Sequence, residues 1–141
     1  MTRSDKRVFT ALQRAGELLL ERLRHPEDTA LLQVHFTVTE AAIQDLGEIF
    51  VTPLERRDLL DIHLSLLHAS RLACPLSAAL LEAGSQTVAL LRLLPRPTQA
   101  RAACQKNYRL LWKLQAVNKQ QELLLRSLLR VCENILRAAT A

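Results

Sequence analysis

Apolar residues recur at three- and four-residue spacing along almost the whole chain, and few turn-forming residues interrupt them. This spacing places apolar side chains on one face of an α-helix, so it predicts a series of amphipathic helices. The composition agrees, because 49% of the 141 residues are hydrophobic, only 3 are glycine, and aromatic residues make up 4%. Such a chain lacks the β-branched and aromatic runs that strands need. We predict an all-α fold in a single domain, residues 1–141.

The prolines divide this pattern into segments, because proline cannot continue a helix. The predicted helices run to Pro26, over about 29–50, from Pro53 to near Cys74–Pro75, from Leu76 to about Leu94, and from 98 onward. The last is predicted as one long helix with a coiled-coil-like apolar seam, interrupted by Asn107 and Gln121. Together these segments predict an up-and-down bundle of four to five antiparallel helices.

The stretch VTPLE, residues 51–55, indicates a sharp turn between two helices. Thr52 is suited to cap the following helix through its hydroxyl group, and Pro53 occupies the first helical position, where its missing N–H costs nothing. Glu55 stands three residues after the cap and completes a capping box. The preceding helix is therefore predicted to stop before Thr52.

The positive charge of the chain is concentrated in its last segment. From Thr98 onward there are eight basic residues and two acidic ones. Lys106, Arg109 and Lys113 form one stripe at helical spacing, and a second stripe is formed by Arg126, Arg130 and Arg137. We predict that these stripes orient an acidic protein partner or anionic headgroups, the alternative being a solvated surface. Nucleic acid is not expected, because Tyr108 and Trp112 are the only aromatic residues among these charges.

The sequence offers few residues that could converge for catalysis. It contains neither a GxxxxGK[ST] nor a GxGxxG phosphate loop, and its four histidines form no HxxxH pair. Asp58 and Asp61 share a helix face and, with Glu40 and Asp45, form a fragment of a carboxylate metal site; they also suit the first turns of a helix. We predict no catalytic residues, no cofactor and no metal.

Three cysteines, Cys74, Cys104 and Cys132, are widely spaced and form no CxxC motif. They indicate neither a disulfide framework nor a thiolate metal site, and Cys132 is predicted to be a small buried residue of the seam. The chain shows no secretory signal and no stretch of about 18 uncharged residues. A cytoplasmic protein is predicted.

The segment FVTPLERRDLLDI resembles the FxTPxDRxDI signature of PhoU-like phosphate-transport regulators, in the branch associated with Pit-type phosphate transporters. Phe50, Thr52, Pro53, Arg56 and Asp58 match this signature. FTALQRAGELLLERL and LSAALLEAGSQTVALLRLL are similar to the first and fourth helices of that family. The resemblance covers about two-thirds of the chain and implies a PhoU-like bundle. The acidic metal motifs of the family are absent from residues 31–39 and 112–121, which favours a regulator without metal chemistry.

A second resemblance concerns LLLRSLLRVCENILRA, residues 123–138, which is similar to the last helix of FlgN-type flagellar export chaperones. The two resemblances imply different partners for one non-enzymatic, helical adaptor. A PhoU-like regulator would bind a cytoplasmic loop of a phosphate transporter and reach the membrane only through it. A chaperone would bind export substrates. The resemblance places Ala141 short of the last helix of the PhoU-like family, so we expect either a fifth helix that runs on uninterrupted or an apolar groove left for a partner. A homodimer through the seam of the last helix is the other way to cover apolar surface.

Overall fold

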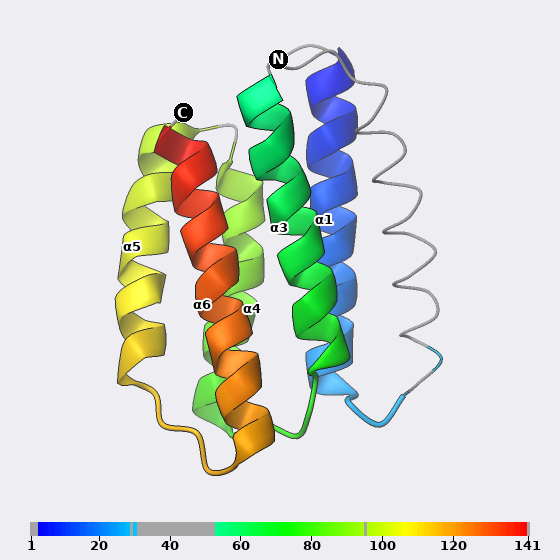
Figure 1. Ribbon diagram of the computed structural model, residues 1–141, viewed down its shortest axis with the longest axis vertical. Helices are drawn as coiled ribbons and strands as arrows, with labels where there is room; N and C mark the ends of the chain where they lie inside the picture. Colours follow the sequence, from blue (N-terminus) through cyan, green and yellow to red (C-terminus); the bar gives the residue numbers. More distant parts are fainter. Residues whose placement is uncertain (1–2, 29, 31–52, 95, 141) are drawn as a thin grey trace.

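The computed structural model describes residues 3–28, 30, 53–94 and 96–140. All regular secondary structure in these ranges is helical (Figure 1). The helices are α1 (Arg3–Arg24), α3 (Pro53–Arg71), α4 (Ala78–Ala89), the 3₁₀-helix η1 (Leu90–Leu93), α5 (Pro97–Lys113) and α6 (Lys119–Thr140). The all-α prediction is thus confirmed for these residues. The helix predicted over 29–50, with Glu40 and Asp45, and the cap at Thr52 lie outside the described residues.

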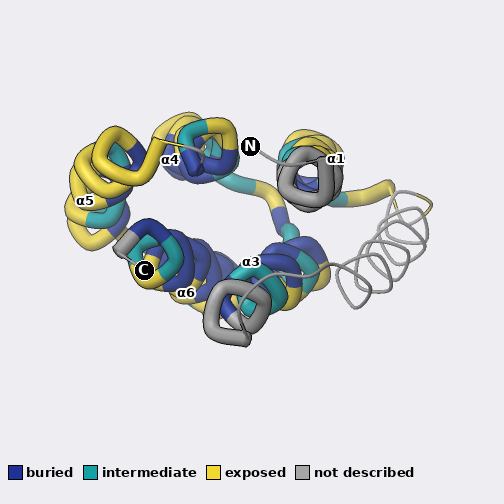
Figure 2. The backbone as a smooth tube through the Cα atoms, turned by 90° about the horizontal axis from the view of Figure 1, so that it is seen from above, coloured by how far each residue is buried: buried dark blue, intermediate teal, exposed yellow. Residues whose placement is uncertain are grey.

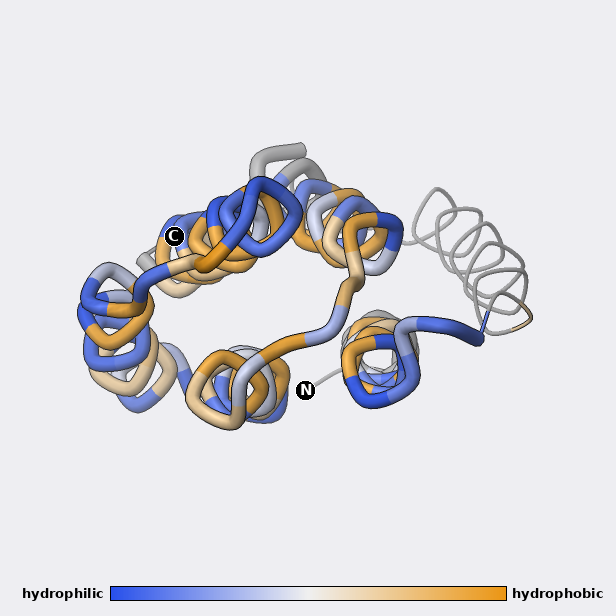
Figure 3. Tube along the Cα trace, turned by 90° about the horizontal axis from the view of Figure 1, so that it is seen from below, coloured by the Kyte–Doolittle hydropathy of each residue, from blue (hydrophilic) through white to orange (hydrophobic). Residues whose placement is uncertain are grey.

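The five described α-helices stand side by side with their long axes roughly aligned (Figure 1). α1, α3 and α5 run in one direction, and α4 and α6 run in the other. Seen along their axes, they form a ring in which α1, α4, α5, α6 and α3 follow one another (Figure 2). Buried residues lie on the inner faces of the ring, and the hydropathy of the helices follows the same pattern (Figure 3).

Local proline chemistry sets most of the described helix ends. As predicted, α1 ends before Pro26, at Arg24, and α3 begins at Pro53. α5 follows the predicted break and begins with Pro97 at its first position. Between α3 and α4 the chain is extended around Pro75, and the hydroxyl of Ser77 accepts a hydrogen bond from the backbone N–H of Leu80 at 3.3 Å. This bond caps α4.

The prediction of one long helix from residue 98 onward is wrong. α5 ends at Lys113, the backbone of Leu114 is extended, and α6 begins at Lys119 and runs back along α5. The side chain of Asn118 accepts a hydrogen bond from the Gln121 backbone N–H at 2.9 Å, so it caps α6. Gln121 in turn accepts from the Val117 N–H at 3.1 Å. Leu111 before the turn and Leu124 after it are both buried in the core, whereas Val117 within the turn is exposed.

Replacing Asn118 by alanine should lower the free energy of unfolding by about 1 kcal/mol, because α6 loses the acceptor at its first turn. Urea unfolding followed by circular dichroism measures this loss. Asn118→Ser keeps a capping oxygen and should retain most of the stability. An Asn118→Ala variant with the wild-type midpoint would contradict this role of the side chain.

The core is built mainly of leucine from all parts of the ring. Its largest side chains with almost no exposed surface include Leu12, Leu19, Ile62, Leu66, Leu91, Leu111, Leu124, Leu128 and Ile135. Gly16 allows α1 to pack closely on η1, because a Cβ atom there would lie 2.5 Å from Cδ1 of Leu91. The seam of α6 that was predicted for a homodimer is buried inside this single chain.

One buried cation stabilises an end of the bundle. The guanidinium of Arg22 donates hydrogen bonds to the carbonyl oxygens of Pro26 and Asp28, both at 2.9 Å, and to that of Ser70 at 3.4 Å. These bonds connect the turn after α1 to the end of α3, and they compensate for the loss of hydration of the charge.

Within the described ranges, every helix is too short or too polar to span a lipid bilayer.

Candidate partner-binding site

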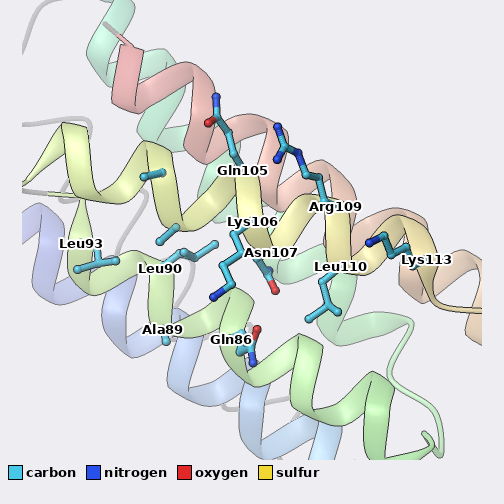
Figure 4. Close-up of a pocket in the computed structure, with 12 residues that line it drawn as sticks. Gln86, Ala89, Leu90, Leu93, Gln105, Lys106, Asn107, Arg109, Leu110 and Lys113 are labelled. Carbon is cyan, nitrogen blue, oxygen red and sulfur yellow. The ribbon is translucent and has the colours of Figure 1, made fainter.

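A groove of about 740 Å³ runs between α4 with η1 and the facing side of α5 (Figure 4). We call it the α4–α5 groove. Gln86, Ala89, Leu90 and Leu93 form one wall, and Ala102, Ala103, Gln105, Lys106, Asn107, Arg109, Leu110 and Lys113 form the other. Alanines on both walls leave room between the helices, and Leu110 keeps 38% of its surface exposed. The groove can therefore receive apolar side chains from outside the chain.

Asn107 supplies the most buried polar group of this groove. The residue is 3% exposed, and its amide nitrogen donates to Thr87 Oγ1 at 2.7 Å and to Cys132 Sγ at 3.5 Å. Its Oδ1 atom is buried and has no hydrogen-bond partner in the described part of the chain. In Figure 4 this oxygen points toward the α4 side of the groove. Because buried acceptors are usually paired, this oxygen is an unsatisfied polar atom at the base of the groove.

The first predicted basic stripe lies along this groove but does not face one way. Lys106 extends from α5 toward Ala89 and Gln86 of α4, and Lys113 lies at the far end of the groove (Figure 4). Arg109 extends to the opposite side of α5. All three side chains are exposed, and no described carboxylate forms an ion pair with them. Their positive charge is therefore available to an acidic ligand.

The second stripe lies on α6, away from the α4–α5 groove. Arg126 forms an ion pair with Glu122 at 2.6 Å, and both side chains are well exposed. Arg130 lines a smaller pocket between α6 and α3, together with Asp61, His68 and Asn134. The structure therefore separates the predicted partner-binding residues into two surfaces, and only the first borders an apolar groove.

The two aspartates of the predicted metal fragment face an arginine. Nε of Arg137 lies 3.3 Å from Asp58 Oδ1, and Nη2 lies 3.2 Å from Asp61 Oδ2. Asn134 of α6 donates to Ser65 Oγ at 2.8 Å and joins this contact between α3 and α6. Among the described residues, no three His, Cys, Asp or Glu side chains gather as metal ligands would.

Of the five residues that match the PhoU-like signature, only Asp58 has a described side chain. Phe50 and Thr52 lie outside the described residues, and so do the side chains of Pro53 and Arg56. Asp58 is buried, and its contact with Arg137 ties α3 to α6. This contact is a structural role for the aspartate.

The cysteines are free thiols, and all three are buried. Cys104 donates to the backbone oxygen of Cys132 at 3.2 Å, next to Asn107. Its hydrogen bond with the Cys132 thiol, together with burial, raises the pKa of Cys104. Hydrogen bonds directed at its sulfur, first from Cys104, lower the pKa of Cys132. The pair thus lies beneath the groove floor as part of a polar contact among α4, α5 and α6.

Sequence reasoning missed the groove itself, although it identified the three cations that line it, Lys106, Arg109 and Lys113. Its walls come from two segments, and the spacing of alanines in either one looks like ordinary helix packing. Asn107 was recognised only as a polar interruption of the seam. That interruption is the local signal that could have directed attention to this face of α5.

Comparisons with protein families, curated proteins and solved structures found no match for this chain. The PhoU-like and FlgN-type resemblances therefore remain predictions from the sequence.

Proposed function

We propose that the protein is a non-enzymatic adaptor that binds an acidic, amphipathic helical segment of a protein partner in the α4–α5 groove. The supporting observation is the combination of apolar walls, exposed Lys106 and Lys113, and the buried Oδ1 of Asn107 in one groove. Partner helices use such grooves by inserting apolar residues at i, i+3 or i+4, and i+7. Acidic residues beside these anchors would meet the lysines.

The length of the groove suits a short helix. From Ala102 to Lys113 the wall on α5 extends about 16 Å, which corresponds to about three turns. Alanine side chains at Ala89, Ala102 and Ala103 permit a close approach of the partner backbone, and Leu90 and Leu110 offer apolar contact.

Two classes of partner fit the resemblances. The PhoU-like segment favours an acidic cytoplasmic loop of a phosphate transporter or a related membrane protein. The FlgN-type segment favours an export substrate, which the protein would hold as a chaperone does. A transporter regulator should prefer one peptide sequence, whereas a chaperone should accept many amphipathic segments with similar affinity.

A fluorescently labelled peptide tests the groove directly. The probe is an amphipathic helix with leucine at i, i+4 and i+7 and with glutamate beside these positions, and its binding is followed by fluorescence anisotropy. Lys106→Glu with Lys113→Glu should weaken binding by about tenfold at low salt, and the difference should shrink as salt is added. Ala102→Phe should also abolish binding, because the new ring occupies the groove without changing its charge.

Arg101→Glu is the matched control, because Arg101 is an exposed cation on the same helix that does not line the groove. It should leave the affinity within about twofold of wild type. Equal binding by the wild type and the Ala102→Phe variant would refute the groove as the binding site. Equal losses for Arg101→Glu and Lys106→Glu would reduce the basic stripe to a general charge effect.

A further inference from the structure

Exposed apolar side chains gather where α5 turns into α6. Of the five large hydrophobic residues that are exposed in the described part of the chain, four lie between Leu110 and Leu123, and the fifth is Leu64 on α3. Trp112 is 65% exposed, Val117 is 82% exposed, and Leu123 is 38% exposed. We call these three residues the α5–α6 tip; none of them lines the α4–α5 groove. Single exposed apolar residues are normal, but a local cluster indicates a contact site.

The backbone holds Val117 in this exposed position. Its N–H donates to Gln121 Oε1 at 3.1 Å, and Gln121 Nε2 donates to the carbonyl oxygen of Pro75 at 3.0 Å. The turn is thereby fastened to the loop between α3 and α4. Trp112 is also placed by a neighbour, since its ring lies edge-on to that of Tyr108 with centroids 6.2 Å apart. The turn between α5 and α6 lies at one end of the bundle (Figure 1).

Positive charge surrounds the tip. Residues 105–126 contain Lys106, Arg109, Lys113, Lys119 and Arg126 and a single acidic residue, Glu122. Glu122 contacts Lys119 at 3.8 Å and Arg126 at 2.6 Å, which leaves a net positive surface. The acidic residues Glu27 and Asp28 follow α1, which is not a neighbour of α5 in the ring (Figure 2).

We propose that the α5–α6 tip docks on an anionic membrane surface, with Trp112 and Val117 entering the headgroup region and Lys113 and Lys119 contacting lipid phosphates. Tryptophan prefers this region of a bilayer, and each nearby lysine is attracted to anionic lipid. A convex apolar end with a basic margin fits a lipid surface, whereas a peptide needs the concave α4–α5 groove. This contact goes beyond the proposed adaptor function, because it brings the protein to the membrane without a partner.

Trp112 is the only tryptophan of the chain, so intrinsic fluorescence of the intact protein reports on the tip. The probe is a vesicle made from an equimolar mixture of phosphatidylcholine and phosphatidylglycerol. We expect a blue shift of the emission and cosedimentation with these vesicles, neither of them with phosphatidylcholine alone, and weakening of both by salt. Val117→Asp should lower the vesicle affinity by about tenfold or more while the fold persists, because this side chain makes little contact within the chain.

Leu64→Asp is the matched control, since it places the same charge at an exposed apolar site on α3. It should leave vesicle binding unchanged. Absence of a blue shift with anionic vesicles at low salt overturns the proposal, as does an equal loss for Leu64→Asp and Val117→Asp. A blue shift with the acidic peptide but not with vesicles would assign the tip to a protein and likewise overturn it. Ala102→Phe, which blocks the groove, should not affect vesicle binding, so the two proposals can fail separately.

Discussion

Lowering the pH from above 6.5 to about 4 should remove about 3 kcal/mol of stability through His63. This residue of α3 has no exposed surface, and neither ring nitrogen has a hydrogen-bond partner among the described residues. Burial lowers the pKa of the imidazole to about 4, from an ordinary value of 6.5. Between these values the unfolded chain binds a proton and the folded chain does not. The stability that depends on a neutral His63 is therefore fully present above pH 6.5 and is lost as the pH falls toward 4.

Urea unfolding at a series of pH values measures this effect. His63→Leu replaces the imidazole with an apolar side chain of similar size, so the variant should lose about 3 kcal/mol less than wild type over the same interval. The matched control is His68→Gln, a change at an exposed histidine of the same helix, and the acid slope should survive it. Parallel pH profiles for the wild type and His63→Leu would show that another group causes the loss.

The helix ends at Pro53 and Pro97 could be predicted because the signals are local. A missing N–H and a fixed backbone angle act on one turn, whatever the chain does elsewhere. The turn between α5 and α6 was missed for the opposite reason. Apolar spacing continues through residues 114–118 and indicates a helix. The signal for a break between two helices is carried only by the side chains of Asn118 and Gln121. Asn118 followed three residues later by Gln121 has the form of an N-terminal cap, but Gln121 was interpreted only as a polar interruption of the seam.

The candidate site shows the same division between local and long-range information. Charge counting along the chain located Lys106 and Lys113, because a helix places them on one side at a known spacing. It could not show that η1 and α4 lie opposite, nor that Arg109 extends the other way. Asp58 and Asp61 likewise looked like residues of a first turn or a metal site. Their partner, Arg137, lies on a helix whose separate existence the sequence pattern concealed.

Replacing Arg137 by methionine should lower the free energy of unfolding by about 3 kcal/mol, because it leaves the Asp58 carboxylate buried without its cation. The Asp58 side chain is 4% exposed, whereas that of Arg137 is 54% exposed. We therefore expect a loss of unfolding free energy at the low end of the range for a broken buried ion pair, because water can reach the arginine side chain. Methionine preserves the unbranched stem and the helix propensity of α6, but it also removes the more exposed contact of Arg137 with Asp61.

A double-mutant cycle separates this pair from the rest of the contact. Asp58→Asn removes the charge that Arg137 compensates, so the double variant should be more stable than the sum of the single losses implies, by about 2 kcal/mol. Arg126→Met is the matched control on the same helix. Its ion pair with Glu122 is shorter, at 2.6 Å, than the 3.3 Å contact of Arg137 with Asp58, but both side chains of the Arg126–Glu122 pair are exposed. We expect a loss below about 0.5 kcal/mol for this control, because burial of the carboxylate, and not distance, decides the cost. Equal losses of unfolding free energy for the Arg126 and Arg137 variants, with no coupling to Asp58, would contradict this prediction. The contact between α3 and α6 would then be stabilised by its apolar side chains alone.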